Sequence, residues 1–189
     1  MKRTPITALE LQLYLDGIID ISEPSFLLTF DDGYADILDA LAYAIQKNIK
    51  PLVFILSDPK KVSRRELDNP LPLLDNHQLT SLVRSGCDIG SHGATHSRLT
   101  LLPLNLAKTE ISASKTTLEN LLGCPVNYFS FPKGSYTPQL IKTVRDSGYK
   151  LSFSMDDKII SPGTDPYNIP RIGVNGTHDF EEFTWLDTY

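Results

Sequence analysis

Short apolar runs alternate with amphipathic segments along the chain, and this alternation predicts strands that take turns with helices. The expected strands are 26–30, 52–56, 88–91, 126–131, 151–154 and 169–174. The expected helices are 6–15, 35–47, 76–84, 104–122 and 138–147, with a last short helix in 179–189. Strands that alternate with helices lie parallel and are joined by right-handed crossovers, so the pattern predicts an α/β fold, either a barrel or an open sheet.

Length and composition set the scale of this fold. The chain has 189 residues, of which 41% are hydrophobic and 22% are charged, so it can bury one sizeable core. We therefore expect a single domain over residues 1–189. Residues 57–72 are rich in charge and proline, and they are expected to form a long loop that shapes access to the mouth of the fold.

Two adjacent carboxylates follow the first of these main strands, in the segment Thr29-Phe30-Asp31-Asp32-Gly33. In α/β proteins, catalytic and binding residues gather at the carboxyl ends of the strands. Because the chain turns at Gly33, both side chains can lean over the same mouth with different neighbours. Taken alone, Asp-Asp-Gly is better explained as a plain turn in which Asp bonds its own backbone.

A second polar strand end contains two of the four histidines, His92 and His96. If the segment after His92 turns helically, the i, i+4 spacing presents both imidazoles to one point. Two neutral imidazoles and a carboxylate form a common facial metal site with open positions, and Asp32 is the expected third ligand. A lone histidine is more often a satisfied core or surface residue, so the pair alone favours neither interpretation.

A third strand end breaks at a proline and a glycine, in the segment Phe129-Ser130-Phe131-Pro132-Lys133-Gly134. A type I or type II turn explains these residues without any function. The segment becomes informative only together with the two polar strand ends that precede it.

In this order the three segments resemble the motifs of the polysaccharide deacetylase family, the carbohydrate esterases of family four, over about residues 25–175. The resemblance implies a metal-dependent hydrolase that removes N-acetyl groups from an amino-sugar polymer or oligosaccharide. It implies that Asp31 is the catalytic base and that Asp32, His92 and His96 hold a divalent ion. Two imidazoles and one carboxylate favour zinc, which would lower the pKa of a bound water toward neutrality.

The resemblance also favours a distorted, incomplete (β/α) barrel with about six to seven parallel strands, fewer than the eight of a regular barrel. Such a ring is open or is completed by another chain or a further segment. A homodimer is one arrangement that would complete it.

The third motif departs from the usual family pattern Arg-x-Pro-Tyr-Gly. This chain has Ser130-Phe131-Pro132-Lys133-Gly134, so the Arg and the Tyr are both missing. The departure resembles the branch with Phe-x-Tyr-Pro-Tyr-Gly, which includes deacetylases of poly-N-acetylglucosamine biofilm polymers. In the implied mechanism, a backbone N–H of the Pro132-Lys133-Gly134 turn, that of Lys133, holds the oxyanion together with the metal.

Arg171 is a candidate to replace the missing arginine, because Asn168-Ile169-Pro170-Arg171-Ile172 resembles a late Pro-Arg strand of the family. Our hypothesis is that Arg171 pairs with Asp31 and keeps this base ionised. A surface or structural ion pair explains Arg171 equally well.

The general acid is not assigned, because the family's Leu-x-His tripeptide is absent and no histidine precedes His77. His178 is the internal candidate for protonating the departing amine, although a solvated loop histidine explains it better. His77 is expected at the start of a helix that Asp75 or Asn76 caps.

Charge and cysteine content exclude some classes of protein. A net charge of −5 and a pI near 5.3 argue against binding of nucleic acid, which needs a basic surface. Cys87 and Cys124 lie in different elements without a Cys-x-x-Cys motif, so nothing demands an oxidising compartment.

Targeting segments are not visible in the sequence. No apolar run is long enough to span a membrane, and Glu10, Gln12 and Asp16 interrupt any signal-peptide core. The sequence as it stands therefore predicts a cytoplasmic protein, or else a fragment of an exported one.

Two other functions stay open. The chain could be a metal-containing carbohydrate-binding or accessory domain that is inactive because it lacks a general acid. It could also be an amidase acting on a small non-sugar amide, since the same metal and base would serve any amide. Substrate choice lies in loops such as 57–75, whose shape the sequence does not show.

Overall fold

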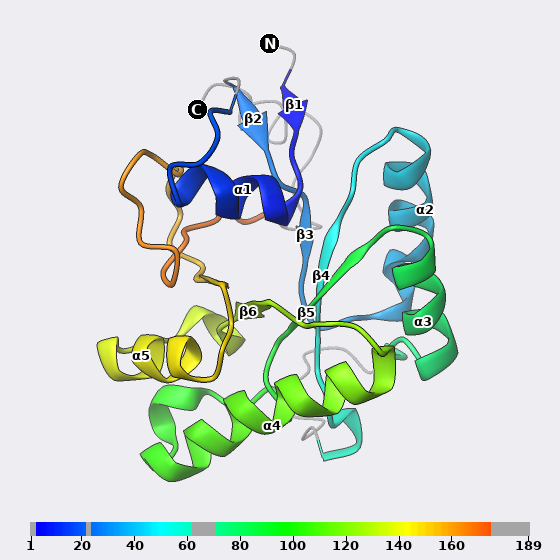
Figure 1. The fold of residues 1–189 in the computed structure, drawn as a ribbon. Helices are drawn as coiled ribbons and strands as arrows, with labels where there is room; N and C mark the ends of the chain where they lie inside the picture. Colours follow the sequence, from blue (N-terminus) through cyan, green and yellow to red (C-terminus); the bar gives the residue numbers. More distant parts are fainter. Residues whose placement is uncertain (1–2, 22–23, 62–70, 175–189) are drawn as a thin grey trace.

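The fold is built on an all-parallel five-stranded sheet in the order β3-β4-β5-β6-β7 (Figure 1). The structure, a computed structural model, describes residues 3–21, 24–61 and 71–174. The strands of the sheet are Thr29–Phe30, Leu52–Ile55, Asp88–Ser91, Tyr128–Ser130 and Leu151–Phe153. A short parallel pair, β1 (Thr4–Pro5) and β2 (Ser25–Phe26), stands apart from this sheet. Because neighbouring strands are consecutive in the sequence, as in a barrel, the sheet curls into an open half-barrel.

Helices cover both faces of the curled sheet (Figure 1). On one face lie α2 (Leu38–Gln46), α3 (Asn76–Arg84), α4 (Leu104–Leu122) and α5 (Pro138–Asp146). On the other face lies α1 (Ala8–Leu15). Short 3₁₀ turns occur at Ala35–Ile37, Pro59–Lys61, Leu99–Leu101 and Pro132–Gly134.

Strand β4 shows how the two cores are divided. Val53 and Ile55 pack with the four outer helices, whereas Leu52 and Phe54 pack with α1, and all four are buried. Successive side chains of a strand point to opposite faces, so a strand covered on both faces must be apolar at every position. This explains the unbroken apolar run from Leu52 to Leu56.

Local signals set several helix ends where the sequence predicts them. Asp75 accepts a hydrogen bond from the Gln78 amide, and the Gln78 side chain accepts one from the Asp75 amide, which is a capping box for α3. Helix α4 ends at Gly123, whose left-handed φ of 67° an L side chain rarely adopts. The predictions 76–84, 104–122 and 88–91 are confirmed to the residue.

Two predicted strands differ from the structure. The expected strand 26–30 is divided, since β2 pairs with β1 whereas β3 pairs with β4 in the main sheet. The expected strand 169–174 is reduced to one parallel bridge between Phe153 and Ile169. The next ladder bond would come from the Arg171 amide, but this amide donates to the Asp156 carbonyl at 3.2 Å instead.

The expected fold class is confirmed, because parallel strands with intervening helices form a distorted, incomplete barrel. The last predicted helix, 179–189, lies outside the described residues. None of the described helices combines the length and the apolar character needed to cross a membrane.

Candidate active site

A tight turn after β3 points two neighbouring carboxylates at different partners. The Gly33 amide donates to the Asp31 carbonyl at 2.9 Å, and Asp32 and Gly33 have φ values of 69° and 75°. Aspartate tolerates this left-handed region better than most residues do. A Cβ on Gly33 would lie 2.7 Å from Cδ1 of Ile55, so a larger residue would displace that side chain in addition to straining the left-handed backbone.

The first histidine of the pair continues strand β5. The His92 amide donates to the Ile55 carbonyl at 2.8 Å, which extends the pairing of β5 with β4 by one residue. The Nδ1 atom of His92 lies 2.8 Å from the Ser130 carbonyl oxygen. A carbonyl can only accept, so Nδ1 carries the hydrogen and Nε2 presents its lone pair to the opposite side.

The second histidine reaches the same place through a loop. Residues 93–98 are not helical, so the condition that the segment after His92 turns helically is not met. His96 instead has a left-handed φ of 60°. The centroids of the His92 and His96 rings lie 5.1 Å apart. The imidazoles therefore meet because the loop folds back, and not because of helical spacing.

Asp32, His92 and His96 converge on one point. Oδ1 of Asp32 lies 3.4 Å from Nε2 of His92 and 3.2 Å from Nε2 of His96. One ligand atom from each residue falls within 4.8 Å of the other two, and both imidazoles are buried. No other group of three such side chains within the described ranges meets this geometry.

The donor set fits a divalent metal ion. Oδ1 of Asp32 is buried and accepts no hydrogen bond from the described residues, although two ring nitrogens lie close to it. A buried carboxylate oxygen without a donor is costly, and a cation at this point would satisfy it together with the two imidazoles. Two nitrogen ligands and one oxygen ligand are typical of zinc sites with an open position.

Asp31 borders these ligands, with Oδ2 at 4.0 Å from Nε2 of His92, and its carboxylate binds a guanidinium group. Nη1 and Nη2 of Arg171 donate to Oδ1 and Oδ2 of Asp31, both at 2.7 Å. Ser130 Oγ donates to the same carboxylate at 3.3 Å and accepts from Arg171 at 2.9 Å. Burial alone would raise the pKa of Asp31, but the charge that His92 carries when it is protonated and the hydrogen bonds and charge of Arg171 outweigh it and lower the pKa to about 2. The carboxylate is therefore ionised.

The guanidinium of Arg171 is itself held firmly. Nε donates to the Ser154 carbonyl at 3.0 Å, and Nη1 also donates to Thr29 Oγ1 at 3.2 Å. The rings of Phe54 and Phe153 lie 5.5 Å and 5.9 Å from the guanidinium carbon. Each N–H of the guanidinium has an acceptor, and aromatic rings lie beside it. This arginine is therefore fixed in place and orients Asp31.

The third motif forms the turn that follows β6. Lys133 and Gly134 have left-handed φ values of 57° and 62°, and a Cβ on Gly134 would lie 2.7 Å from Cβ of Met155. A Cβ on Gly93 would lie 3.4 Å from Cγ of Pro132, so the turn packs against the histidine loop. Pro132 has no N–H and the Gly134 amide donates to the Phe131 carbonyl at 2.9 Å, and the role of the Lys133 amide as oxyanion donor stays a prediction.

Among the described residues, one further histidine, His77, lies outside this cluster. His77 lies on the exposed first turn of α3, as predicted. His178 lies outside the described residues, so its expected role as general acid stays a prediction.

Two residues beside the cluster were missed in the sequence. Ser130 was noted only as a replacement for the family arginine, although its hydroxyl joins Asp31 to Arg171 and its carbonyl orients His92. The sequence signal for these roles of Ser130 was its position at the end of a predicted strand. Glu110 lies in the middle of a helix and contacts the histidine loop, and no local pattern marks it.

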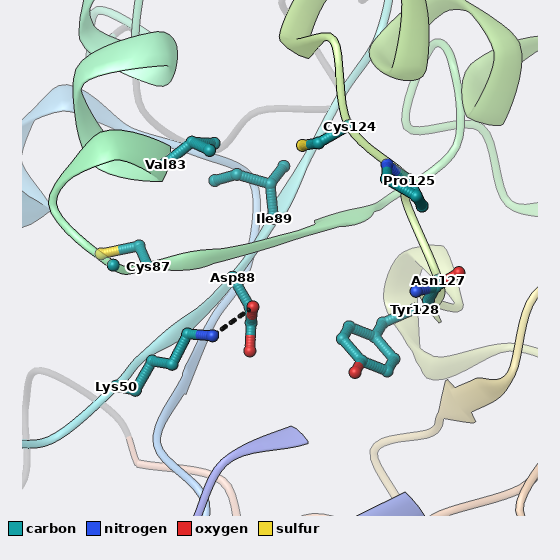
Figure 2. A pocket seen from close by; sticks show the side chains of 10 residues that line it. Lys50, Val83, Cys87, Asp88, Ile89, Cys124, Pro125, Asn127 and Tyr128 are labelled. Carbon is teal, nitrogen blue, oxygen red and sulfur yellow. Dashed lines mark ion pairs between the residues drawn. The ribbon is translucent and has the colours of Figure 1, made fainter. Parts of the chain in front are cut away.

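A separate cavity of about 230 Å³ lies at the opposite ends of the strands. Figure 2 shows that Lys50 and Asp88, an ion pair at 2.9 Å, line it together with Cys87, Cys124 and Tyr128. These residues precede or begin β4, β5 and β6, whereas the Asp-His cluster follows the strands. This cavity is therefore not part of the cluster.

Several known proteins are similar to this chain. A family profile described as polysaccharide deacetylase matches residues 19–152. YxkH of Bacillus subtilis (strain 168), whose name places it provisionally among the polysaccharide deacetylases, is 25% identical over 171 residues. These cover 90% of this chain and 58% of YxkH, so the chain spans less than two thirds of this relative.

Solved structures share the fold. The deacetylase PplD of Streptococcus pyogenes, in complex with acetate, superposes with a TM-score of 0.81 at 19% identity, covering 95% of this chain and 77% of PplD. IcaB of Ammonifex degensii also superposes with a TM-score of 0.81, at 26% identity, covering 91% of this chain and 77% of IcaB. The family profile spans well over half of the sequence and includes the Asp-Asp and His-x-x-x-His segments, and the chain therefore belongs to the polysaccharide deacetylase family.

Proposed function

We propose that this protein is a metal-dependent hydrolase that removes N-acetyl groups from an amino-sugar polymer or oligosaccharide. One observation carries the proposal: Asp32, His92 and His96 converge on one point beside the ionised, arginine-bound Asp31. Membership in the family supports the reaction class. The similar fold of PplD, which was solved with acetate, is consistent with acetate as the product.

Asp32, His92 and His96 would hold the divalent ion, and the two imidazoles favour zinc. When bound, such an ion supplies a Lewis acid and a water acidic enough for a carboxylate of low pKa to deprotonate. The Ser130 carbonyl keeps His92 in the tautomer that a metal requires.

Asp31 is the proposed base. Its Oδ2 lies 4.0 Å from Nε2 of His92, so the carboxylate borders the cluster, and Arg171 prevents it from rotating. Asp31 accepts a proton from water while the water oxygen bonds to the acetamide carbonyl carbon. The carbon–nitrogen bond then breaks, which leaves acetate and, after protonation of the nitrogen, a free amino sugar.

The backbone amide of Lys133 is the proposed donor to the oxyanion. The Lys133 turn follows Ser130, which touches Asp31, and packs on the histidine loop through Pro132. A backbone N–H aimed at developing negative charge stabilises the transition state without moving.

The departing nitrogen needs a proton. Two described histidines belong to the cluster, and His77 is exposed on the first turn of α3. We therefore propose His178 or solvent as the donor. If His178 is the donor, His178→Ala should lose rate in a pH-dependent way. If solvent is the donor, the rate of His178→Ala should not change.

The proposal is tested by acetate release from N-acetylglucosamine oligomers with the zinc-loaded protein. Asp31→Asn and His92→Ala should abolish release, because they remove the base and a metal ligand. His77→Ala is the matched control and should keep the wild-type rate, since His77 is exposed on α3.

Other outcomes distinguish the remaining functions. A wild-type protein that binds zinc but hydrolyses neither the oligomers nor a small amide would be an accessory or binding domain. Hydrolysis of a small amide without release from the oligomers would identify an amidase.

A further inference from the structure

A carboxylate from α4 holds the loop that connects the two histidines. Oε2 of Glu110 accepts hydrogen bonds from the Ala94 and Thr95 amides, each at 3.0 Å. Oε1 of Glu110 accepts one from the Thr95 hydroxyl, also at 3.0 Å. The Thr95 hydroxyl in turn lies 2.8 Å from Ser97 Oγ. One side chain thus binds three donors in two consecutive residues between His92 and His96.

The loop needs such support because of its shape. It begins where β5 ends and reverses through Gly93 and His96, with φ values of 78° and 60°. A histidine in the left-handed region is strained relative to an ordinary conformation and persists only when its surroundings hold it. Hydrogen bonds to an ionised acceptor are roughly twice as strong as neutral ones.

The two histidines depend on this support to different degrees. His92 is fixed by strand pairing to Ile55 and by the Ser130 carbonyl. His96 follows directly after the residue that Glu110 binds, beyond the last strand hydrogen bond. The position of Nε2 of His96, 3.2 Å from Oδ1 of Asp32, therefore follows from the conformation of the loop.

We propose that Glu110 is a positioning residue of the metal centre, whose carboxylate holds residues 93–97 in the conformation that lets His96 and His92 bind one ion together. The hydrogen bonds of Glu110 go to Ala94 and Thr95 rather than to the metal-ligand candidates themselves. Partners of this kind orient the ligands, and their loss costs about 10–100-fold in metal affinity. The inference rests on the proposed function in so far as the cluster binds a metal.

The test compares metal binding by wild type and by Glu110→Ala. The dissociation constants for Zn²⁺ and Co²⁺ are measured by competition with a chromophoric chelator, and the thermal midpoint of each metal-free protein is recorded. We expect Glu110→Ala to weaken binding about 10–100-fold. We also expect the absorption spectrum of bound Co²⁺ to change, because it reports the arrangement of the ligands.

Glu119 provides a matched control on the same helix. Its Oε1 accepts from the Val126 amide at 3.0 Å and pairs with Lys115 at 2.9 Å, so it also ties a loop to α4. That loop leads into the beginning of β6, away from the cluster at the strand ends. Glu119→Ala should lower the thermal midpoint and leave the metal affinity and the Co²⁺ spectrum unchanged.

Glu110→Gln keeps the result decisive if Glu110→Ala does not fold. Its amide oxygen can still accept from the two backbone N–H groups, but the negative charge is lost. We expect a smaller loss of affinity than for Ala, with partial retention of the Co²⁺ spectrum.

Failure of the inference and failure of the proposed function give different results. If Glu110→Ala and Glu110→Gln bind metal as wild type does, with unchanged spectra, Glu110 is only structural and the proposed function stands. If the wild type binds no metal, the metal centre and the inference are both wrong.

Discussion

The ion pair between Arg171 and Asp31 yields a quantitative prediction. Replacing Arg171 with Met removes two charge-assisted hydrogen bonds of 2.7 Å and leaves a carboxylate without its counter-charge. Hydrogen bonds to charged groups contribute about 1.5–3 kcal/mol each, and breaking a buried ion pair costs about 3–5 kcal/mol. The side chains of Arg171 and Asp31 are 14% and 26% exposed, so solvent screens part of this loss.

We therefore expect Arg171→Met to lower the free energy of unfolding by about 3 kcal/mol, at the low end of the range for buried pairs. For a chain of this size, this corresponds to a drop of about 6–12 °C in Tm. Urea unfolding measures the change, and a double-mutant cycle with Asp31→Asn isolates the coupling between the two side chains. Most of the loss should appear as coupling energy.

Two further measurements complete this test. Lys142→Met removes an exposed ion pair with Asp146 and should change the stability by less than about 0.5 kcal/mol. Arg171→Met should also depress acetate release while zinc stays bound, because none of the hydrogen bonds of Arg171 goes to Asp32, His92 or His96. Stability within about 0.5 kcal/mol of wild type, together with a normal rate, would refute the reasoning.

Three other predictions follow from the structure. Dialysis against EDTA should abolish acetate release and zinc should restore it; persistent release from metal-free protein would contradict a metal-dependent reaction. Gly90→Ala places a Cβ 2.5 Å from the ring of Phe54 and should cost about 1–3 kcal/mol by urea unfolding, whereas Gly173→Ala, with open space around it, should be near neutral. Burial, with the charge of Asp88, raises the pKa of Cys87 to about 11, so below that pH the unreactive thiol predominates. Cys87 should resist a thiol reagent at pH 8 until the protein unfolds; rapid labelling of native Cys87 would disprove this.

Much of the fold follows from local signals. The capping box at Asp75 and the left-handed Gly123 mark helix ends within the chain itself, and the alternation of elements implies a parallel sheet. Parallel strands bring their carboxyl ends to one edge of the sheet. The sequence alone therefore predicts that residues such as Asp32 and His92 lie close together.

The misplaced elements have causes outside the local sequence. The run 26–30 is one apolar stretch, yet its two halves pair with different strands in different sheets. The pair His92 and His96 has helical spacing, yet the loop between them bonds to Glu110, which lies far along the chain. Neither competing partner is visible in a short window of sequence.

The sequence by itself determined the α/β alternation and the strand ends that carry Asp31, Asp32, His92 and His96. These features depend on the spacing of hydrophobic residues and on turn residues, which are signals within a few neighbouring positions of the sequence. Only the tertiary structure decided that Arg171 binds Asp31, 140 positions away. It also decided which imidazole atoms face Asp32, since a distant carbonyl orients one ring and a distant carboxylate holds the loop of the other. Long-range hydrogen bonds form only when packing brings their partners together, so their geometry belongs to the fold as a whole.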